Sequence, residues 1–282
     1  MFYILYNALS KSGKNKKNLE ELVELVKQRN TEYTMMNIIE IKDCSKFLES
    51  INEDDEVVIV GGDGTVHHVA NQLKNHQPIK QNLYLFAAGT GNDFIRNINQ
   101  PIKQLVRIND YLYDLPSLSV NGEDWLFVNG AGLGVDALVC LGVNAGNSEK
   151  KSVYTKITLK SFLTYKPCDM DVEIDGEKHH FKKCWICVAM NGECQGGGLK
   201  FAPGAKVDRV DLDFLCLHNC GRLKTFWVFA HLMFGGKHLK FKKNVFYKKV
   251  ENVKITSSVP LPLQKDGETI ENVQEVTMKV KG

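Results

Sequence analysis

The chain has 282 residues, of which 43% are apolar and 24% are charged, and its formal net charge is +3. This length accommodates two domains, and this composition is typical of a folded globular protein rather than a disordered or fibrous one. A charge of +3 is too small to indicate nucleic-acid binding, so we expect no nucleic-acid partner.

The start of the chain, MFYILYNALSKSGK, lacks the basic, apolar and cleavage regions of an export signal. No apolar run approaches the roughly 20 residues of a membrane-spanning helix. The eight cysteines are then expected to be free thiols in a reducing compartment. We therefore expect a cytoplasmic protein without a transmembrane segment.

The first half of the chain alternates strand-like and helix-like patterns. Apolar, β-prone runs at residues 2–6, 56–60 and 83–87 predict strands, and apolar spacing at residues 18–27 and 66–73 predicts helices. The second and third of these strands each stop at a glycine-rich turn. Because short continuous apolar runs are typical of buried parallel strands, we predict an α/β N-terminal domain with a parallel sheet.

The second half carries hairpin signals instead. Residues 169–175 and 249–255 alternate between apolar and polar, and helical patterns occupy residues 148–164 and 222–234. Three dipeptides that favour tight hairpin turns separate β-prone runs: Asn121-Gly122, Asp175-Gly176 and Asp266-Gly267. The second domain is therefore expected to be a mainly antiparallel sheet or sandwich.

The change in pattern predicts a domain boundary near Pro116. It divides the chain into an N-terminal domain at residues 1–115 and a C-terminal domain at residues 116–271. A last strand pattern lies at residues 274–280, and the sequence leaves open whether residues 272–282 complete the first domain.

The sharpest local signal is the turn Gly61-Gly62-Asp63-Gly64-Thr65, which separates a predicted strand from a predicted helix. Glycines let the backbone approach a ligand closely, and successive N–H groups ahead of a helix can bind phosphate oxygens. Asp63 fits among these positive dipoles if it faces Mg²⁺. The alternative is a plain turn in which Asp63 caps the helix, and the pentapeptide alone does not separate the two.

A second glycine-rich turn, Gly89-Thr90-Gly91-Asn92-Asp93-Phe94, follows the next strand. In an open α/β sheet ligands bind at this end of the strands, although Asn92-Asp93 also fits an ordinary helix N-cap. The chain has no Gly-x-x-x-x-Gly-Lys-Ser/Thr motif, and no Gly-x-Gly-x-x-Gly follows its first strand. A P-loop enzyme is thereby excluded, and a Rossmann dinucleotide site is disfavoured.

Two cysteine pairs, Cys184/Cys187 and Cys216/Cys220, have a spacing like that of zinc ligands. The first pair lies in a pattern typical of one buried strand, where residues three apart point to opposite faces. Zinc sites usually take paired ligands from a turn. We therefore expect buried thiols rather than a zinc site.

The ordered set of motifs resembles the diacylglycerol kinase catalytic family, which includes bacterial soluble diacylglycerol kinases and sphingosine kinases. The matching positions run from Asn7 to Glu268 in the order of that family. They comprise residues 61–65, 89–94, Asp114, 129–136, Asn191-Gly192, 196–198, 202–206 and Asp266-Gly267-Glu268.

The resemblance implies a C-terminal β-sandwich domain, with the nucleotide site in the cleft between the two domains. It implies phosphoryl transfer from ATP, with Mg²⁺, to a lipid hydroxyl. Asp63, Asp93 and Asp114 would hold Mg²⁺ on the nucleotide, partly through water. The nucleotide-binding positions would be Asn7, Gly61, Gly62, Asp63, Gly64, Thr65, Gly89, Thr90 and Asn92.

The resemblance also implies that Asp266 accepts the proton of the lipid hydroxyl, with Glu268 beside it. Phosphoryl transfer does need an oriented hydroxyl, and a carboxylate in reach can supply that. Without the resemblance, a simple hairpin turn is the favoured explanation of Asp266-Gly267. Because Asn-Gly forms the same turn, Asp266→Asn is expected to remove only the charge.

One region departs from the family pattern. The family usually has an Asp-Asp-Gly cluster after the Ala-Lys pair, and this cluster helps to hold a structural Mg²⁺. Here Arg209 replaces one acidic residue and Val210 replaces the glycine. Asp208 and Asp213 still match, so the resemblance leaves a second metal site open but doubtful.

Two segments could contact a membrane surface peripherally. Residues 150–166 mix lysines with apolar side chains, and residues 221–249 contain eight Lys/Arg and no Asp or Glu, interleaved with aromatic residues. Such surfaces suit anionic lipid headgroups. The alternative is that both helices bury their apolar faces and only expose their lysines.

Two other functions stay open. An NAD kinase shares the Gly-Gly-Asp-Gly-Thr loop, but the second glycine-rich turn and the basic, aromatic C-terminal half favour a lipid acceptor. A catalytically silent nucleotide-binding regulator is disfavoured because Asp63, Asp93, Asp266 and Glu268 are all present. The sequence leaves open which lipid is phosphorylated and whether the chain forms a homodimer.

Overall fold

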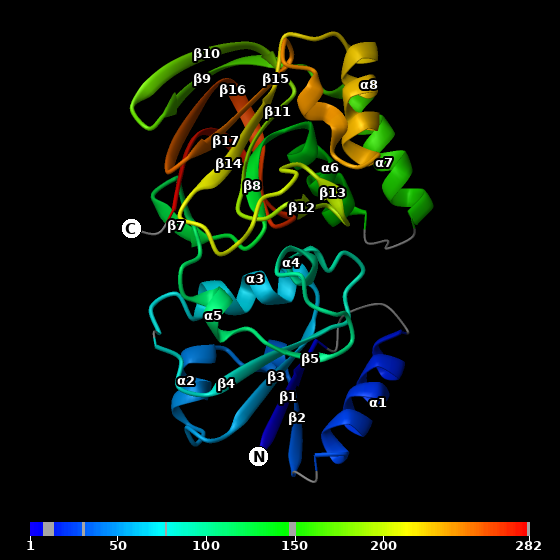
Figure 1. Cartoon of the computed structure of the whole chain (residues 1–282), viewed down its shortest axis with the longest axis vertical. Coiled ribbons are helices and arrows are strands. Elements are labelled where there is room, and N and C mark those ends of the chain that lie inside the picture. The colour runs from blue at the N-terminus through cyan, green and yellow to red at the C-terminus, as the bar shows by residue number, and fades with distance from the viewer. Residues whose placement is uncertain (8–13, 30–31, 77, 147–150, 281–282) are drawn as a thin grey trace. The chain divides into compact units, whose positions relative to one another are not determined.

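The chain separates into two units, Met1–Leu115 and Pro116–Gly282, and each has its own sheet (Figure 1). The computed structural model describes residues 1–7, 14–29, 32–76, 78–146 and 151–280. Residues 8–13 of the predicted first loop and residues 148–150 of a predicted helix lie outside this range.

The elements of the first unit follow the predicted alternation of strands and helices. They are β1 Phe2–Tyr6, α1 Lys14–Lys27, β2 Tyr33–Asn37, η1 Ile38–Glu40, α2 Cys44–Glu49, β3 Glu56–Gly61, α3 Asp63–Gln72, β4 Asn82–Ala87, α4 Asp93–Asn97, β5 Leu105–Arg107 and α5 Asn109–Leu112.

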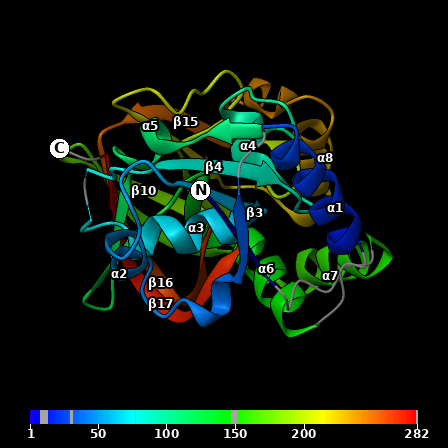
Figure 2. The same cartoon turned by 90° about the horizontal axis from the view of Figure 1, so that it is seen from below.

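The sheet of the first unit has the order β2-β1-β3-β4-β5. The first four strands are parallel, which confirms the predicted α/β domain, and β5 adds an antiparallel edge that the sequence did not indicate. The apolar residues of β3 are buried, and Val58 and Val60 pack in one cluster with Leu22 and Val26 of α1. Figure 2 shows the same elements from below.

The second unit is mainly antiparallel, as predicted. Its elements are β6 Ser117–Val120, β7 Glu123–Leu126, β8 Gly130–Gly134, α6 Val135–Ala145, α7 Lys151–Thr164, β9 Cys168–Ile174, β10 Glu177–Cys184, β11 Ile186–Met190, β12 Cys194–Gln195, β13 Leu199–Lys200, β14 Leu212–Leu217, α8 Arg222–Met233, η2 Lys237–Lys240, β15 Val245–Val250, β16 Asn252–Lys265 and β17 Glu268–Lys279.

The long strand β16 gives the second unit its sandwich-like form. Its first part pairs with β9 over Val253 to Ser257, and its last part pairs with β8 over Leu263 to Lys265. The register shifts between these parts, around Pro260 and Pro262, because proline cannot donate a ladder hydrogen bond. The predicted strand at residues 249–255 is in fact the end of β15 and the start of β16, with Glu251 between them.

The C-terminal strand β17 belongs to the second unit. It pairs with β16 along its length and with β6 over Thr277 to Lys279. The three predicted hairpin dipeptides turn β6 into β7, β9 into β10 and β16 into β17, and the first residue of each has a positive φ. Among the described residues, no helix has both the length and the apolar character needed to cross a membrane.

Candidate active site

The two glycine-rich turns of the first unit lie next to each other. β3 and β4 are neighbouring parallel strands with Gly61 opposite Ala87, and the Ala88 N–H donates to the Gly61 carbonyl at 2.9 Å. The turns that follow these strands lead into α3 and α4, as Figure 1 shows. The sheet therefore brings together two segments that are separated by about one strand–helix unit.

Contact between the two turns explains why two of their residues are glycines. A Cβ on Gly62 would lie 2.9 Å from the Gly89 Cα, and a Cβ on Gly89 would lie 2.5 Å from the Gly62 Cα. Neither distance is tolerable, so both backbones need the absence of a side chain. Gly64 differs, because its Cβ would meet nothing within 4 Å among the described residues. A close-lying ligand would explain a glycine at that position.

Asp63 joins the two turns through its carboxylate. One oxygen accepts from the Asp93 N–H at 3.0 Å and the other from the Phe94 N–H at 2.7 Å. These are first-turn amides of α4, which otherwise lack acceptors within the helix. The alternative of an ordinary N-cap does not hold: Asn92 occupies the N-cap position of α4, but it is left-handed (φ 53°) and makes no side-chain cap bond. Asp63 caps this helix instead.

Asn92 has an unsatisfied buried oxygen. Its side chain is 7% exposed, and its amide nitrogen donates to the Gly89 carbonyl at 2.8 Å. Its Oδ1 has no hydrogen-bond partner among the described residues, and it lies 3.0 Å from where a Gly89 Cβ would stand. Buried acceptors are nearly always satisfied, so this oxygen indicates a donor from a ligand or an ordered water.

The other predicted nucleotide and metal residues are spread over the same unit. Asp93 is buried and paired with Arg96 at 3.2 Å, whereas Asp114 is exposed. In the part of the chain that the structure describes, these acids do not bring three ligand oxygens within 4.8 Å of one another.

The other predicted nucleotide-binding residues lie on or near the same turns. Asn7 follows β1 beside the end of β3, and Thr90 is exposed in the second turn. Thr65 packs over Gly61, where a Cβ would lie 2.3 Å from its Oγ1.

Asp266 of the second unit does more than turn a hairpin. Its carboxylate accepts from the backbone N–H groups of Val128 and Asn129 at 2.7 Å each, and of Gly130 at 3.2 Å. Its own N–H donates to the Gly130 carbonyl at 3.0 Å. The residue is 9% exposed. The turn thus anchors the segment that leads into β8, more than 130 residues earlier in the chain.

These bonds correct the expectation for Asp266→Asn. A carboxylate offers about four acceptor positions, and the three backbone amides use most of them. An asparagine would turn its own NH₂ group toward an N–H donor. The substitution therefore removes a structural bond as well as a charge. Glu268 begins β17 beside this turn and is exposed.

Lys265 is a buried cation that the sequence did not single out. It is 5% exposed, and its Nζ lies 4.0 Å from the centre of the Trp125 ring. Burial lowers its pKa, while the nearby carboxylates of Glu268, Asp266 and Glu123 oppose that shift. A lysine in an alternating strand normally faces water, so its burial follows from the strand partners and not from local sequence.

A small, mostly apolar cavity lies beside the Asp266 turn. Its volume is about 50 Å³, and Val135, Val139, Phe162 and Phe229 contribute to its apolar lining. Besides Tyr154 and Thr158, three polar side chains line it: Asp136, Gln195 and Gln264.

These three polar side chains form a chain of hydrogen bonds. Gln195 donates to Gln264 at 2.6 Å, and Gln264 donates to Asp136 at 3.2 Å. Gln264 also accepts from the N–H of Gly267 at 3.4 Å, which ties the network to the turn. Burial raises the pKa of Asp136 to about 6. Asp136 Oδ1 and Gln195 Oε1 are buried without a partner among the described residues, so the cavity can bind a polar group at this end.

The prediction that Cys184 and Cys187 lie in one strand and point to opposite faces is wrong. The Sγ atoms of Cys184, Cys187 and Cys216 all lie within 4.8 Å of one another, with Cys187 and Cys216 3.1 Å apart. Cys184 and Cys187 share a side because β10 ends and β11 begins between them, after Lys183 with its positive φ. All three are buried and free, as expected. Burial raises the pKa of Cys187 and Cys216, whereas hydrogen bonds with these two lower the pKa of Cys184 to about 5. Cys220 instead contacts Thr225 at 3.2 Å.

Known families match both units. Residues 1–112 match the diacylglycerol kinase catalytic domain, and residues 130–281 match the YegS C-terminal NAD kinase beta sandwich-like domain. "Putative lipid kinase YtlR" of Bacillus subtilis (strain 168) is 28% identical over 232 residues, which cover 75% of this chain and 73% of the relative. The diacylglycerol kinase of the same strain is 23% identical over 274 residues, 94% of this chain and 88% of the relative.

A crystal structure of a diacylglycerol kinase from Bacillus anthracis str. Sterne has the same fold. It superposes with a TM-score of 0.67 at 17% identity and covers 99% of this chain and 94% of that chain. The match over residues 130–281 alone spans more than half of the sequence. The chain belongs to the diacylglycerol kinase catalytic family of lipid kinases.

Proposed function

We propose that the chain transfers the γ-phosphoryl group of ATP to a lipid hydroxyl, with diacylglycerol as the first acceptor to test. The observation that carries this proposal is the mostly apolar cavity of the second unit, whose polar group Gln264 is linked to the Asp266 turn. At about 50 Å³ it has room for the hydroxyl-bearing end of such an acceptor, whose hydrocarbon chains would lie outside it.

The first unit would bind the nucleotide. Family membership implies the use of ATP. The contact of Gly62 with Gly89, the open space at Gly64 and the unsatisfied Asn92 oxygen support a bound polar ligand at these turns. The N-terminus of α3 adds a favourable dipole for phosphate.

Carboxylates at the same turns fit a hard divalent cation, since Mg²⁺ prefers oxygen ligands and keeps several waters. Asp63 and Asp93 would hold it, with Asp114 contributing through water as the family pattern implies. When bound, Mg²⁺ neutralises charge on the transferring phosphoryl group. Asp63 also keeps α4 in place through its two backbone bonds.

The second unit would orient the acceptor. Asp266 would accept the proton of the lipid hydroxyl, and Glu268 beside it would help to orient that group. The backbone bonds from residues 128–130 hold the Asp266 carboxylate in one position, which is what a general base requires.

An NAD kinase is the second candidate because the C-terminal match is described as NAD kinase beta sandwich-like. NAD carries a charged pyrophosphate and two riboses, and a small cavity lined by Val135, Val139, Phe162 and Phe229 is a poor site for these groups. A kinase assay with Mg²⁺-ATP against diacylglycerol, a sphingoid base, another long-chain alcohol and NAD separates these functions. Phosphorylation of NAD with no lipid product would reverse the proposal.

Filling the cavity should weaken lipid binding selectively. Thr158 lines the cavity from α7 and is half-buried, so Thr158→Phe can intrude without disturbing the core. We expect the KM for the lipid to rise about tenfold with the KM for ATP unchanged, the effect of losing ~1.4 kcal/mol of binding. Leu159→Phe is the control, because the neighbouring Leu159 is 52% exposed. Equal KM values for the lipid in both variants would argue against this cavity as the acceptor site.

α8 and the residue after it expose apolar side chains, so the alternative that this helix buries its whole apolar face does not hold for these residues. Leu223 is 88% exposed and Phe234 is 76% exposed, and Trp227 and Met233 are exposed as well. Lys224 lies 4.7 Å from the Phe241 ring centre on the same basic segment. We propose that this surface contacts the membrane that holds the lipid.

Removing the two most exposed of these side chains should reduce membrane binding. Leu223→Ser with Phe234→Ser is expected to weaken binding to anionic phospholipid vesicles about tenfold or more, because each side chain contributes ~1.5–3 kcal/mol when buried. The control is Tyr33→Ser with Met35→Ser, which changes exposed apolar residues of the first unit. Vesicle co-sedimentation is the measurement. An equal loss in both double variants would contradict a specific role for α8.

Asp63→Asn should separate capping from chemistry. The variant keeps the shape of the side chain but loses the charge, and we expect turnover to fall about 10²-fold or more. Asp43→Asn is the matched control, because Asp43 caps α2 by accepting from the Lys46 N–H at 3.1 Å and has no proposed chemistry. Asp43→Asn should change stability little, because asparagine caps about as well as aspartate. Asp63→Asn should cost about 1–3 kcal/mol, because its NH₂ group would face one of the two backbone N–H donors. Near-normal turnover in Asp63→Asn would show that Asp63 only caps α4.

Asp266→Asn needs a control that makes the same turn, and Asp175 provides it. Asp175 has φ 50°, precedes Gly176 in a hairpin, and accepts from the N–H groups of Glu251 and Asn252 at 3.0 and 2.8 Å. Asp266→Asn should cost about 1–3 kcal/mol of stability, because both Asp266 oxygens accept from backbone N–H groups. Asp175→Asn should cost less, because one Asp175 oxygen accepts both of its bonds.

Only Asp266→Asn is expected to lower kcat, by about 10²–10⁴-fold per folded molecule, because only that residue is the proposed base. Stability is measured by denaturant unfolding, and kcat with saturating lipid and ATP. Asp266 would be an anchor without a catalytic role if the two variants had the same kcat.

A further inference from the structure

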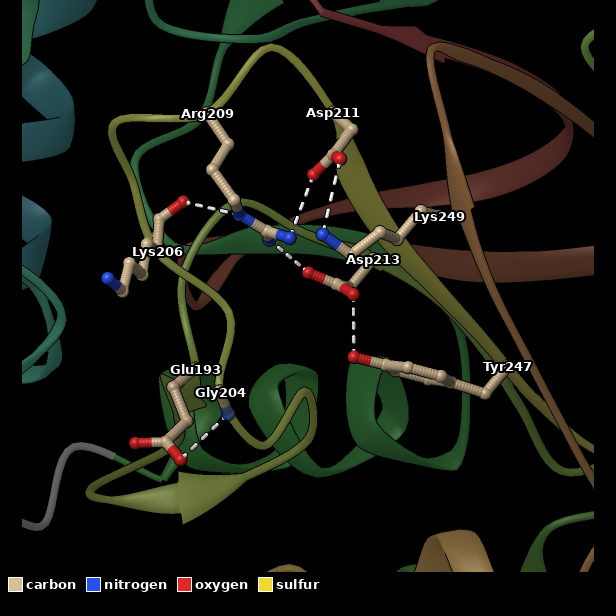
Figure 3. A network of polar contacts seen from close by, with 8 residues as sticks. All are labelled: Glu193, Gly204, Lys206, Arg209, Asp211, Asp213, Tyr247 and Lys249. Atoms are coloured by element: carbon tan, nitrogen blue, oxygen red, sulfur yellow. Dashed lines mark hydrogen bonds and ion pairs between the residues drawn. The ribbon is translucent and has the colours of Figure 1, made fainter.

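Arg209 occupies a pocket of oxygen atoms in the loop before β14 (Figure 3). Its Nε donates to the Lys206 carbonyl at 3.1 Å. One terminal nitrogen lies 2.8 Å from an Asp211 carboxylate oxygen, and the other forms a close ion pair with Asp213. The Arg209 side chain is 18% exposed and that of Asp213 only 1%. The guanidinium is therefore largely buried among one carbonyl and two carboxylates.

These oxygens are the kind of ligand that Mg²⁺ or Ca²⁺ takes in proteins. The charges also balance as they would around a divalent ion. Asp211 and Asp213 carry two negative charges, while Arg209 and Lys249, which lies 3.3 Å from the second Asp211 oxygen, carry two positive charges. Arg209 from this loop and Lys249 from β15 thus supply the charge that a divalent cation would carry.

Tyr247 completes the surroundings of Asp213. Its hydroxyl donates to the Asp213 oxygen that does not face Arg209, at 2.6 Å. Burial and the neighbouring Asp213 carboxylate raise the pKa of Tyr247, so the hydroxyl keeps its proton and stays a donor. Both oxygens of Asp213 are then bound to donors of this chain, and a metal ion would have to displace one of them.

The predicted structural metal site does not fit these residues. Asp208, the other expected ligand, is exposed. Within the described residues, Asp208, Asp211 and Asp213 do not form a group with ligand oxygens within 4.8 Å of one another. A divalent ion would also repel the guanidinium at contact distance.

We infer that Arg209 takes the place of a structural divalent cation in the second unit. Arginine suits this role because it is always charged and offers several donors in a fixed plane. It ties the Lys206 carbonyl to the start of β14 through Asp213. The folded second unit is therefore independent of divalent metal. The inference does not depend on which acceptor the kinase uses.

Thermal unfolding of the full chain without nucleotide tests this inference. The wild-type Tm should be the same in EDTA, in millimolar Mg²⁺ and in millimolar Ca²⁺. Arg209→Met removes the charge and leaves the buried Asp213 unpaired, so its Tm should fall by roughly 6–12 °C. Arg209→Lys keeps a charge and should lose less.

Arg209→Asp restores the acidic residue of the family pattern. Its Tm in EDTA should be low, and millimolar Mg²⁺ or Ca²⁺ should raise it by several degrees, because the cluster then has three carboxylates and no guanidinium. Arg107→Asp is the matched control, since Arg107 makes an exposed ion pair with Asp110 at 2.8 Å in the first unit. That control should lose little stability and gain no response to metal.

Three results would overturn the inference. The first is a wild-type Tm that falls in EDTA and recovers with Mg²⁺ or Ca²⁺. The second is about one tightly bound divalent ion per purified wild-type chain by elemental analysis. The third is an Arg209→Met or Arg209→Lys variant as stable as the wild type. Failure of Arg209→Met to fold leaves the wild-type and Arg209→Lys measurements decisive.

Discussion

A buried backbone N–H must have an acceptor, and in this chain aspartates meet that need at the positions that matter most. Asp63, Asp175 and Asp266 each accept two or three backbone N–H groups from a segment far away in the sequence. Asp63 thereby joins the two glycine-rich turns, and Asp266 fixes the entry to β8. Residues proposed for chemistry are therefore also residues that hold the fold, and a substitution at either changes both.

Much of the fold could be predicted because its signals are local. β1, β3 and β4 are continuous apolar runs, and glycines end β3 where parallel strands normally meet a turn. The hairpin dipeptides predict turns correctly because their first residues adopt a positive φ, which asparagine, aspartate and glycine tolerate. β5 and the two-part pairing of β16 could not be predicted, since both depend on partners distant in sequence.

The candidate site was predictable in its residue types but not in its contacts. Glycines and acidic residues at the ends of strands indicate phosphate and metal binding from their residue types alone. No local pattern shows that Asp63 caps α4 in place of Asn92, or that Lys265 is buried on Trp125. The cysteine cluster was missed for the same reason, because its geometry depends on a break between β10 and β11 and on the distant β14.

The chain binds buried carboxylates in two ways. Backbone amides donate to Asp63 and Asp266 and surround them with partial positive charge. Asp213 is instead matched by the full charge of Arg209 and by the Tyr247 hydroxyl, with both oxygens bound. The Arg209 ion pair and the Tyr247 hydroxyl together make Asp213 part of the scaffold. On this argument Asp213 is structural even though it matches a metal position of the family.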